Sequence, residues 1–149
     1  MEMNKTAAVL EDLIETLEDG REGFEKAAER LDDSEHRDIS VDLRRFSKQR
    51  LDFSIELRAV AAKHGVEIDE EGSLGGALHR GWMDLKAALT GDDPAAVLGA
   101  AESGEDHAVS EFEDALDQDL PPDVRAIVER QAAAVRQAHD QVKALRDAH

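Results

Sequence analysis

The sequence lacks cysteine and tyrosine, and aromatic residues make up only 3% of its 149 residues. Without cysteine the chain has no disulfide, no thiolate metal ligand and no cysteine nucleophile. Alanine, leucine, glutamate and aspartate dominate, and there are only three prolines, so few residues favour β-strands. The composition therefore predicts an all-helical protein.

Basic residues are also scarce, with 18 lysines and arginines against 35 aspartates and glutamates, which gives a formal net charge of −17. Such a surface repels phosphate backbones and anionic lipid headgroups, so we expect neither nucleic acid nor membrane as a partner. No apolar run approaches the roughly 18 residues that a membrane span needs, and Met1 to Lys5 lead directly into an amphipathic pattern. We expect a cytoplasmic protein with a single domain over residues 1–149.

Five segments carry apolar residues every three to four positions, the spacing typical of amphipathic helices. They run from about Thr6 to Leu31, from the break at Asp32–Ser34 to Gly65, from Gly72 to Gly91, from Asp93 to Pro121, and from Pro122 through Leu145. The third is shorter than the others. Four long amphipathic helices with tight connections and one additional shorter helix predict an antiparallel four-helix bundle.

Helix start and stop signals separate these segments. Asp32, Asp33 and Ser34 offer N-cap oxygens for the second helix, and Gly65 is a C-terminal stop. Asp93 followed by Pro94 combines an N-cap with proline at the first helical position, which is a strong start signal.

Several motifs carry a family resemblance. They are LEDLIETLEDGREGFEKAAE at residues 10–29, the set Arg50, Phe53, Glu56 and Leu57, GSLGGALHRGWMDLKAALTG at residues 72–91, AESGED at residues 101–106, and HDQVKALRD at residues 139–147. Together they resemble the bacterial four-helix-bundle family called domain of unknown function 2383, within the ferritin-like superfamily. The resemblance implies a ferritin-like bundle in a cytoplasmic, stress-associated protein, and it brings no established activity or catalytic residues.

The di-iron or di-manganese centre of ferritin-like proteins needs a glutamate on two helices and Glu-x-x-His on the other two. Among the six histidines only His36 has an acidic residue three positions earlier, Asp33, and this pair lies at an interhelical turn. The carboxylates of the first helix fall on its outer face. The sequence therefore predicts no standard di-metal centre, no cofactor and no catalytic residue, and it favours a non-enzymatic protein.

Three polar residues occupy inner positions of the predicted helices, namely Arg50, Glu105 and Gln131. Because a buried charge is retained only when it is paired, we expect Arg50 and Glu105 to pair across the core, with Gln131 completing their hydrogen bonds. In the alternative interpretation, Glu56, Glu105 and His139 supply oxygen and imidazole ligands to a single metal ion, iron or manganese.

The segment around His79, Arg80 and Trp82 is the candidate interface. Tryptophan and arginine are enriched at interfaces, so the segment favours a homo-oligomer, although a local role for Arg80 fits equally well. The sequence points to no particular protein partner. It predicts a non-enzymatic, stress-associated structural or interaction protein; the alternative is a metal-binding oxidoreductase or metal-storage protein with non-standard ligands.

Overall fold

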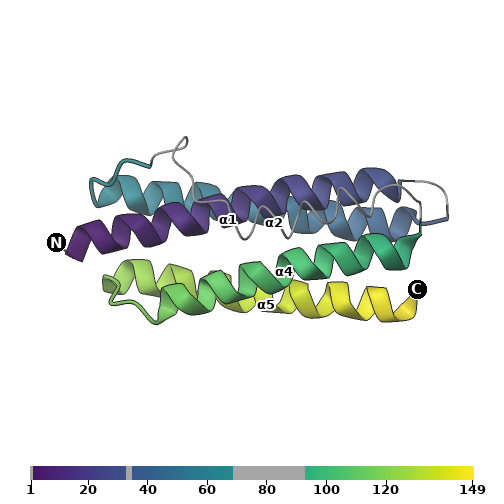
Figure 1. Ribbon diagram of the computed structural model, residues 1–149. Helices are drawn as coiled ribbons and strands as arrows, with labels where there is room; N and C mark the ends of the chain where they lie inside the picture. Colours follow the sequence, from purple (N-terminus) through teal and green to yellow (C-terminus); the bar gives the residue numbers. More distant parts are fainter. Residues whose placement is uncertain (1, 33–34, 69–92) are drawn as a thin grey trace.

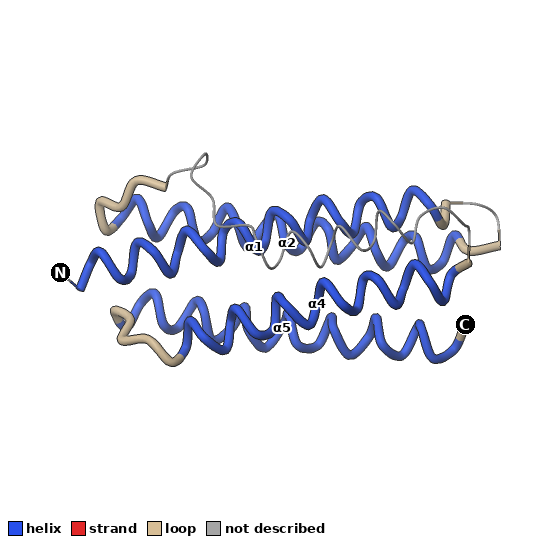
Figure 2. The backbone as a smooth tube through the Cα atoms, in the orientation of Figure 1, coloured by secondary structure: helices blue, strands red, loops and turns tan. Residues whose placement is uncertain are grey.

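A computed structural model describes residues 2–32, 35–68 and 93–149 (Figure 1). Its helices are α1 (Glu2–Arg30), α2 (Arg37–Lys63), α4 (Pro94–Leu116) and α5 (Pro122–Ala148). The part of the chain described contains no strand (Figure 2), which confirms the all-α prediction. The shorter helix expected between Gly72 and Gly91, with its candidate interface residues His79, Arg80 and Trp82, lies outside the described residues. None of the described helices is long and apolar enough to cross a membrane.

The four helices form a bundle in which each contacting pair is antiparallel (Figure 1). The contact between α1 and α2 is the most extensive, followed by those between α4 and α5 and between α1 and α4. The contact between α2 and α5 is the smallest, while α2 and α4 lie diagonally across the bundle. α2 ends and α4 begins at opposite ends of the bundle (Figure 1).

The apolar stripes predicted from the sequence fill the interior. One core cluster surrounds Phe24 and Phe46, whose rings lie 5.4 Å apart, and a second surrounds Leu13, Leu57 and Phe112. Fully buried side chains dominate both clusters, and burial of this kind is the main stabilising contribution in a helical bundle. The long, continuous seam follows from the 3.6-residue period of each stripe.

Two helix ends match their sequence signals. Gly65 has a φ of 71°, and the amides of Gly65 and Val66 donate to Ala62 O and Ala61 O, which is the Schellman arrangement that ends α2. At the start of α4, the amide of Ala95 donates to the Asp93 side chain at 3.1 Å. Both predicted signals are confirmed.

The expected N-cap of α2 is wrong. The N-cap residue is His36, which makes no side-chain capping hydrogen bond. Asp32 accepts instead from Ser40 Oγ at 3.3 Å and from Arg44 Nη2 at 3.2 Å. Its carboxylate therefore binds side chains of the first turns of α2 and not the amides at the start of the helix.

Candidate functional site

A buried ion pair lies at the centre of the bundle. Arg50 on α2 donates through Nη1 to Glu105 Oε1 at 2.5 Å and through Nη2 to Oε2 at 2.6 Å, and both side chains are fully buried. The guanidinium carbon also lies 5.2 Å from the centroid of the Phe24 ring. On α1, Gly20 gives the arginine room, because a Cβ at that position would lie 3.3 Å from Arg50 Nη1. The structure thus brings together the two charges that the sequence placed in the core.

Gln131 is buried, as expected, but it does not complete the hydrogen bonds of that pair. Its Nε2 donates to Phe53 O at 3.2 Å and to Glu56 Oε1 at 2.8 Å. Both acceptors lie further along α2 than Arg50. The guanidinium and the carboxylate of the core pair match each other at two points, and the third partner of Arg50 is Gln49, whose Oε1 accepts from Nε at 3.4 Å.

Glu56, Glu105 and His139 do not form one ligand set in this structure. Glu56 accepts from Gln131 and Arg130, and Glu105 is held by Arg50. His139 contacts other carboxylates altogether. Glu105 points into the core, whereas neighbouring positions of α4 face α5, because each residue turns the side chain by about 100°. Glu56, Glu105 and His139 therefore cannot bind one metal ion together in this arrangement.

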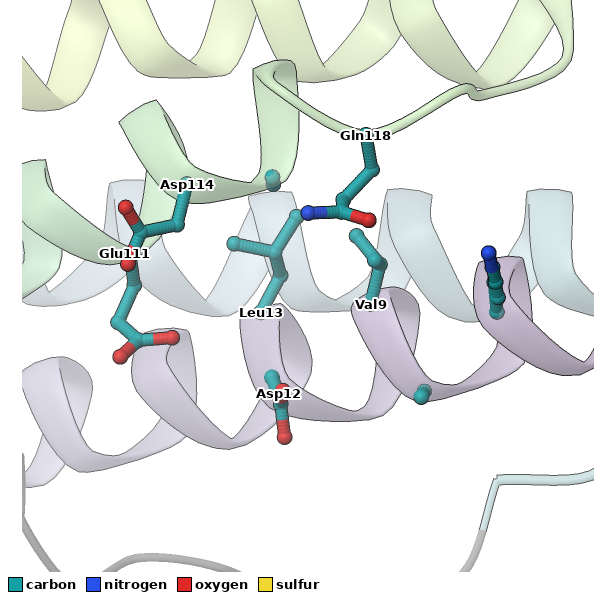
Figure 3. Close-up of a pocket in the computed structure, with 9 residues that line it drawn as sticks. Val9, Asp12, Leu13, Glu111, Asp114 and Gln118 are labelled. Atoms are coloured by element: carbon teal, nitrogen blue, oxygen red, sulfur yellow. The ribbon is translucent and has the colours of Figure 1, made fainter.

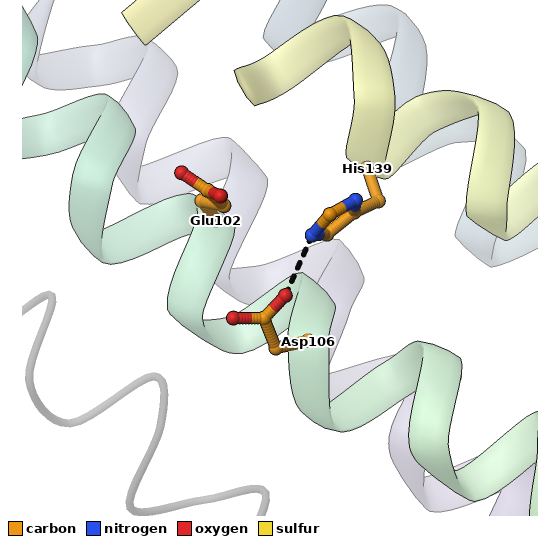
Figure 4. Close-up of side chains that lie close together, drawn as sticks. All are labelled: Glu102, Asp106 and His139. Atoms are coloured by element: carbon orange, nitrogen blue, oxygen red, sulfur yellow. Dashed lines mark hydrogen bonds and ion pairs between the residues drawn. The ribbon is translucent and has the colours of Figure 1, made fainter.

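A cluster of two carboxylates and one imidazole joins α4 to α5 (Figure 4). Glu102 and Asp106 lie one turn apart on α4, and one ligand atom from each, together with one from His139 on α5, lie within 4.8 Å of one another. His139 Nε2 is 2.6 Å from Asp106 Oδ1, and its Nδ1 is 3.2 Å from Asp140 Oδ1. Arg146 forms an ion pair with Glu102 Oε2. These are the ligand types of a divalent transition-metal ion.

The electrostatics of this cluster favour a charged imidazole. Burial lowers the pKa of His139, but hydrogen bonds with Asp140 and Asp106 and the negative charges of Asp106 and Glu102 outweigh it, so the pKa is raised overall. The sequence pattern pointed to His139 but combined it with Glu56 and Glu105, which lie on or beside the inner stripes, and not with Glu102 and Asp106. The signal that could have found it is Glu102 and Asp106 at i and i+4, with a histidine on the facing helix.

An acidic groove of about 450 Å³ lies between α1 and α4 (Figure 3). Asp12, Glu111 and Asp114 surround the apolar side chains of Val9 and Leu13 there. Burial, followed by the charges of nearby acidic residues, raises the pKa of both Asp12 and Glu111. The acidic face of α1 is thus half-buried against α4, and it is less solvated than the sequence pattern indicates.

Among the residues that the structure describes, the large apolar side chains that remain exposed lie on the outer face of α2. Val41, Leu51 and Ile55 are 58%, 43% and 57% exposed. Positive charge is concentrated on the same helix, which has seven lysines and arginines against four acidic residues, whereas α4 has no lysine or arginine. Among the described helices, α2 therefore has the largest excess of positive charge, and α4 is purely acidic in its charged residues apart from His107.

The comparisons with known proteins give one family. The model of the family described as "Domain of unknown function (DUF2383)" matches residues 5–118, which include α2, α4 and all of α1 except its first three residues. No curated protein matches the chain. The match covers more than half of the sequence and agrees with the motifs of the first helix and of the AESGED segment, so the chain belongs to the DUF2383 family.

Proposed function

We propose that the protein is a non-catalytic structural or interaction protein whose working form is a homo-oligomer. The observation that carries the proposal is a second apolar stripe on α2. Its apolar members are Val41, Leu51 and Ile55, and the charged Lys48 lies between them on the same face, so the four positions follow one another at spacings of seven, three and four residues, the pattern of a helix–helix seam. The stripe faces away from Leu43 and Leu57, which α2 buries in the core.

The occupant of this stripe is a second copy of the chain. In a pair of antiparallel α2 helices related by a two-fold axis near Lys48, Val41 of one copy meets Ile55 of the other. The same axis brings the two Lys48 side chains close together, where each is paired with Asp52 of its own chain at 3.1 Å, and it brings Arg44 of one copy opposite Asp52 of the other. An isologous contact of this kind closes on itself and gives a dimer.

The overall charge supports this face over the others. At a net charge of −17, two copies repel each other most strongly through α1 and α4, whereas α2 has an excess of positive charge. The exposed apolar area is small, so we expect a dimer of micromolar affinity, weaker than a permanent one. The ferritin-like affiliation, the cytoplasmic location and the stress association remain predictions beside this proposal.

Sedimentation velocity of the full chain between about 1 and 200 µM tests the proposal, because this range brackets a micromolar dissociation constant. The expected result is a rise from the 16.3 kDa monomer to twice that mass. Leu51→Ser with Ile55→Ser removes the apolar contact without changing the charge, and it should keep the chain monomeric. Ala133→Ser, at an exposed position of α5, is the matched control and should dimerise like the wild type. A wild type that stays at 16.3 kDa throughout the range contradicts the proposal.

A further inference from the structure

The core of the bundle is closed to a metal ion of the ferritin type at the level of Arg50 and Glu105. A guanidinium occupies the centre there, and both oxygens of Glu105 accept hydrogen bonds from it. Positive charge beside the carboxylate opposes a second cation. Any metal ion that this level of the bundle holds must lie outside the core, where other carboxylates and histidines meet.

We propose that Glu102, Asp106 and His139 form a mononuclear site for a divalent transition-metal ion on the α4–α5 face of the bundle, outside the core (Figure 4). The three side chains come from two packed helices, so the protein scaffold sets their spacing before an ion binds. Nitrogen and oxygen ligands together favour zinc and its neighbours over calcium and magnesium, which prefer oxygen alone. Three protein ligands leave a coordination position for water.

The surroundings of His139 are an independent observation that points to a metal. Asp140 Oδ1 lies 3.2 Å from Nδ1, the ring nitrogen that would not bind the ion. Metal-binding histidines almost always donate this second N–H to a carboxylate, a carbonyl or a water, which fixes the tautomer and makes the other nitrogen a better ligand. His139 Nε2 faces Asp106 at 2.6 Å, on the side where the ion would lie, so an ion that binds there displaces the Nε2 proton of the charged imidazole into solvent.

Glu102 can bind an ion without losing its present partner. Arg146 pairs with Oε2 alone, and its side chain is 36% exposed, so water screens its charge in a way that is impossible for the buried Arg50, and Oε1 stays available to an ion. The Glu102 side chain is 12% exposed and that of His139 is 18% exposed, whereas Asp106 is 65% exposed. Glu102 and His139 are therefore held in place by packing, whereas the side chain of Asp106 has room to move.

The adjustment that an ion requires is small. Zinc binds nitrogen and oxygen at about 2.0–2.2 Å, which places its ligand atoms roughly 3–3.6 Å apart. The contact between His139 and Asp106 must lengthen from 2.6 Å, and the most distant of the three ligand atoms must move inward from within 4.8 Å. Rotation of the exposed Asp106 side chain supplies most of this change.

Titration calorimetry of the full chain with zinc chloride tests the site, using protein purified without a chelating column and treated with EDTA. The expected result is one zinc ion per chain, bound at least about tenfold more tightly than calcium. His139→Gln and Asp106→Asn should each weaken binding by about tenfold or more. His64→Gln is the matched control, because it removes a different histidine–carboxylate pair, with Asp123 at 2.8 Å, and it should bind zinc like the wild type.

Nitrogen-15 spectra of the histidine side chains identify the ligand independently of any change in stability. The ring signals of His139 are assigned by their absence from the spectrum of His139→Gln. Zinc should shift these signals in the wild type and leave those of His64 in place. No zinc binding by the wild type at millimolar metal overturns the proposal. Equal binding by the wild type and His139→Gln, or loss of binding in His64→Gln alone, overturns it as well.

Discussion

Arg50 and Glu105 connect two diagonal helices of the bundle through a bidentate ion pair with contacts of 2.5 and 2.6 Å. Both side chains are fully buried, and among the described helices α2 and α4 have no close backbone contact of their own. The pair therefore fixes the axial position of α2 relative to α4 from the inside. Because an uncompensated buried charge is very unfavourable, a shift of either helix along its axis would be strongly opposed.

Glu105→Gln should lower the free energy of unfolding by about 1 to 4 kcal/mol, because it leaves the buried guanidinium poorly compensated. Urea denaturation of the wild type and the variant measures the difference. A loss below about 0.5 kcal/mol, the size expected for surface substitutions, would show that the pair contributes little to the stability of the fold.

A double-mutant cycle with Arg50→Met separates the pair from the rest of the core. Methionine fills much of the arginine volume without a charge, so the double variant should recover a large part of what Glu105→Gln loses. The coupling energy should exceed about 1 kcal/mol, since the two residues are in direct contact. Additive effects of the two substitutions would contradict the pairing.

The burial of this pair follows from the sequence, and the reason is physical. Arg50 lies between Phe46 and Phe53 on one apolar stripe, and Glu105 lies between Ala101 and Ala108 on another. The helical period places these two opposite charges in the core, and they pair with each other because a buried charge needs a partner. The length and inward face of each described helix follow from the same 3.6-residue period.

Other contacts depend on how far one helix slides along its neighbour, and no local pattern sets that distance. Gln131 was expected beside Arg50 but lies beside Phe53 and Glu56, further along α2. The cluster of Glu102, Asp106 and His139 needs two helices in one register, so a motif search within a single helix cannot detect it. The i and i+4 spacing of Glu102 and Asp106 can be found in the sequence, but the register that places His139 opposite them cannot.

Two helical glycines give a matched comparison of close packing. A Cβ on Gly20 would lie 3.3 Å from Arg50 Nη1, whereas a Cβ on Gly99 would have only Arg146 Cδ near it, at 3.9 Å. Gly99→Ala should stabilise the fold by about 0.5–1 kcal/mol through helix propensity. Gly20→Ala should gain less or lose stability, because Arg50 is held at two points and cannot move away. Equal gains, measured by urea denaturation, would show that Arg50 adjusts freely.

The distribution of charge predicts no measurable binding to duplex DNA at moderate salt. Acidic residues occur on every described helix, and binding to a phosphate backbone depends on the release of counterions by clustered basic residues. A gel-shift titration at micromolar protein should leave the duplex free. A saturable complex that weakens with salt would show that the basic face of α2 acts as a nucleic-acid surface.

Asp12 and Glu111 predict a stability that depends on pH in a definite direction. Burial raises the pKa of each carboxyl above its usual value, and the charges of acidic neighbours raise it further. The folded state then binds more protons than the unfolded state between the two pKa values, so the contribution of these groups is full at acidic pH and is lost as the pH rises toward 7. Asp12→Asn and Glu111→Gln should each stabilise the fold at pH 7 by about 0.5 kcal/mol, the size of a like-charge contact on a helix.

Asp32 is the control for this pH effect, because its pKa is shifted in the opposite direction. The hydrogen bond from Arg44 and the arginine's charge lower the pKa of Asp32, so its contribution is present at neutral pH and is lost as the pH falls. Asp32→Asn should therefore destabilise the fold at pH 7 and matter less in acid. Urea denaturation at pH 7 and near pH 4, close to the ordinary pKa of a carboxyl group, measures the free energy of unfolding of all three variants. If Asp12→Asn and Asp32→Asn changed stability in the same direction at pH 7, burial and the neighbouring negative charges would not determine the contribution of Asp12 to stability.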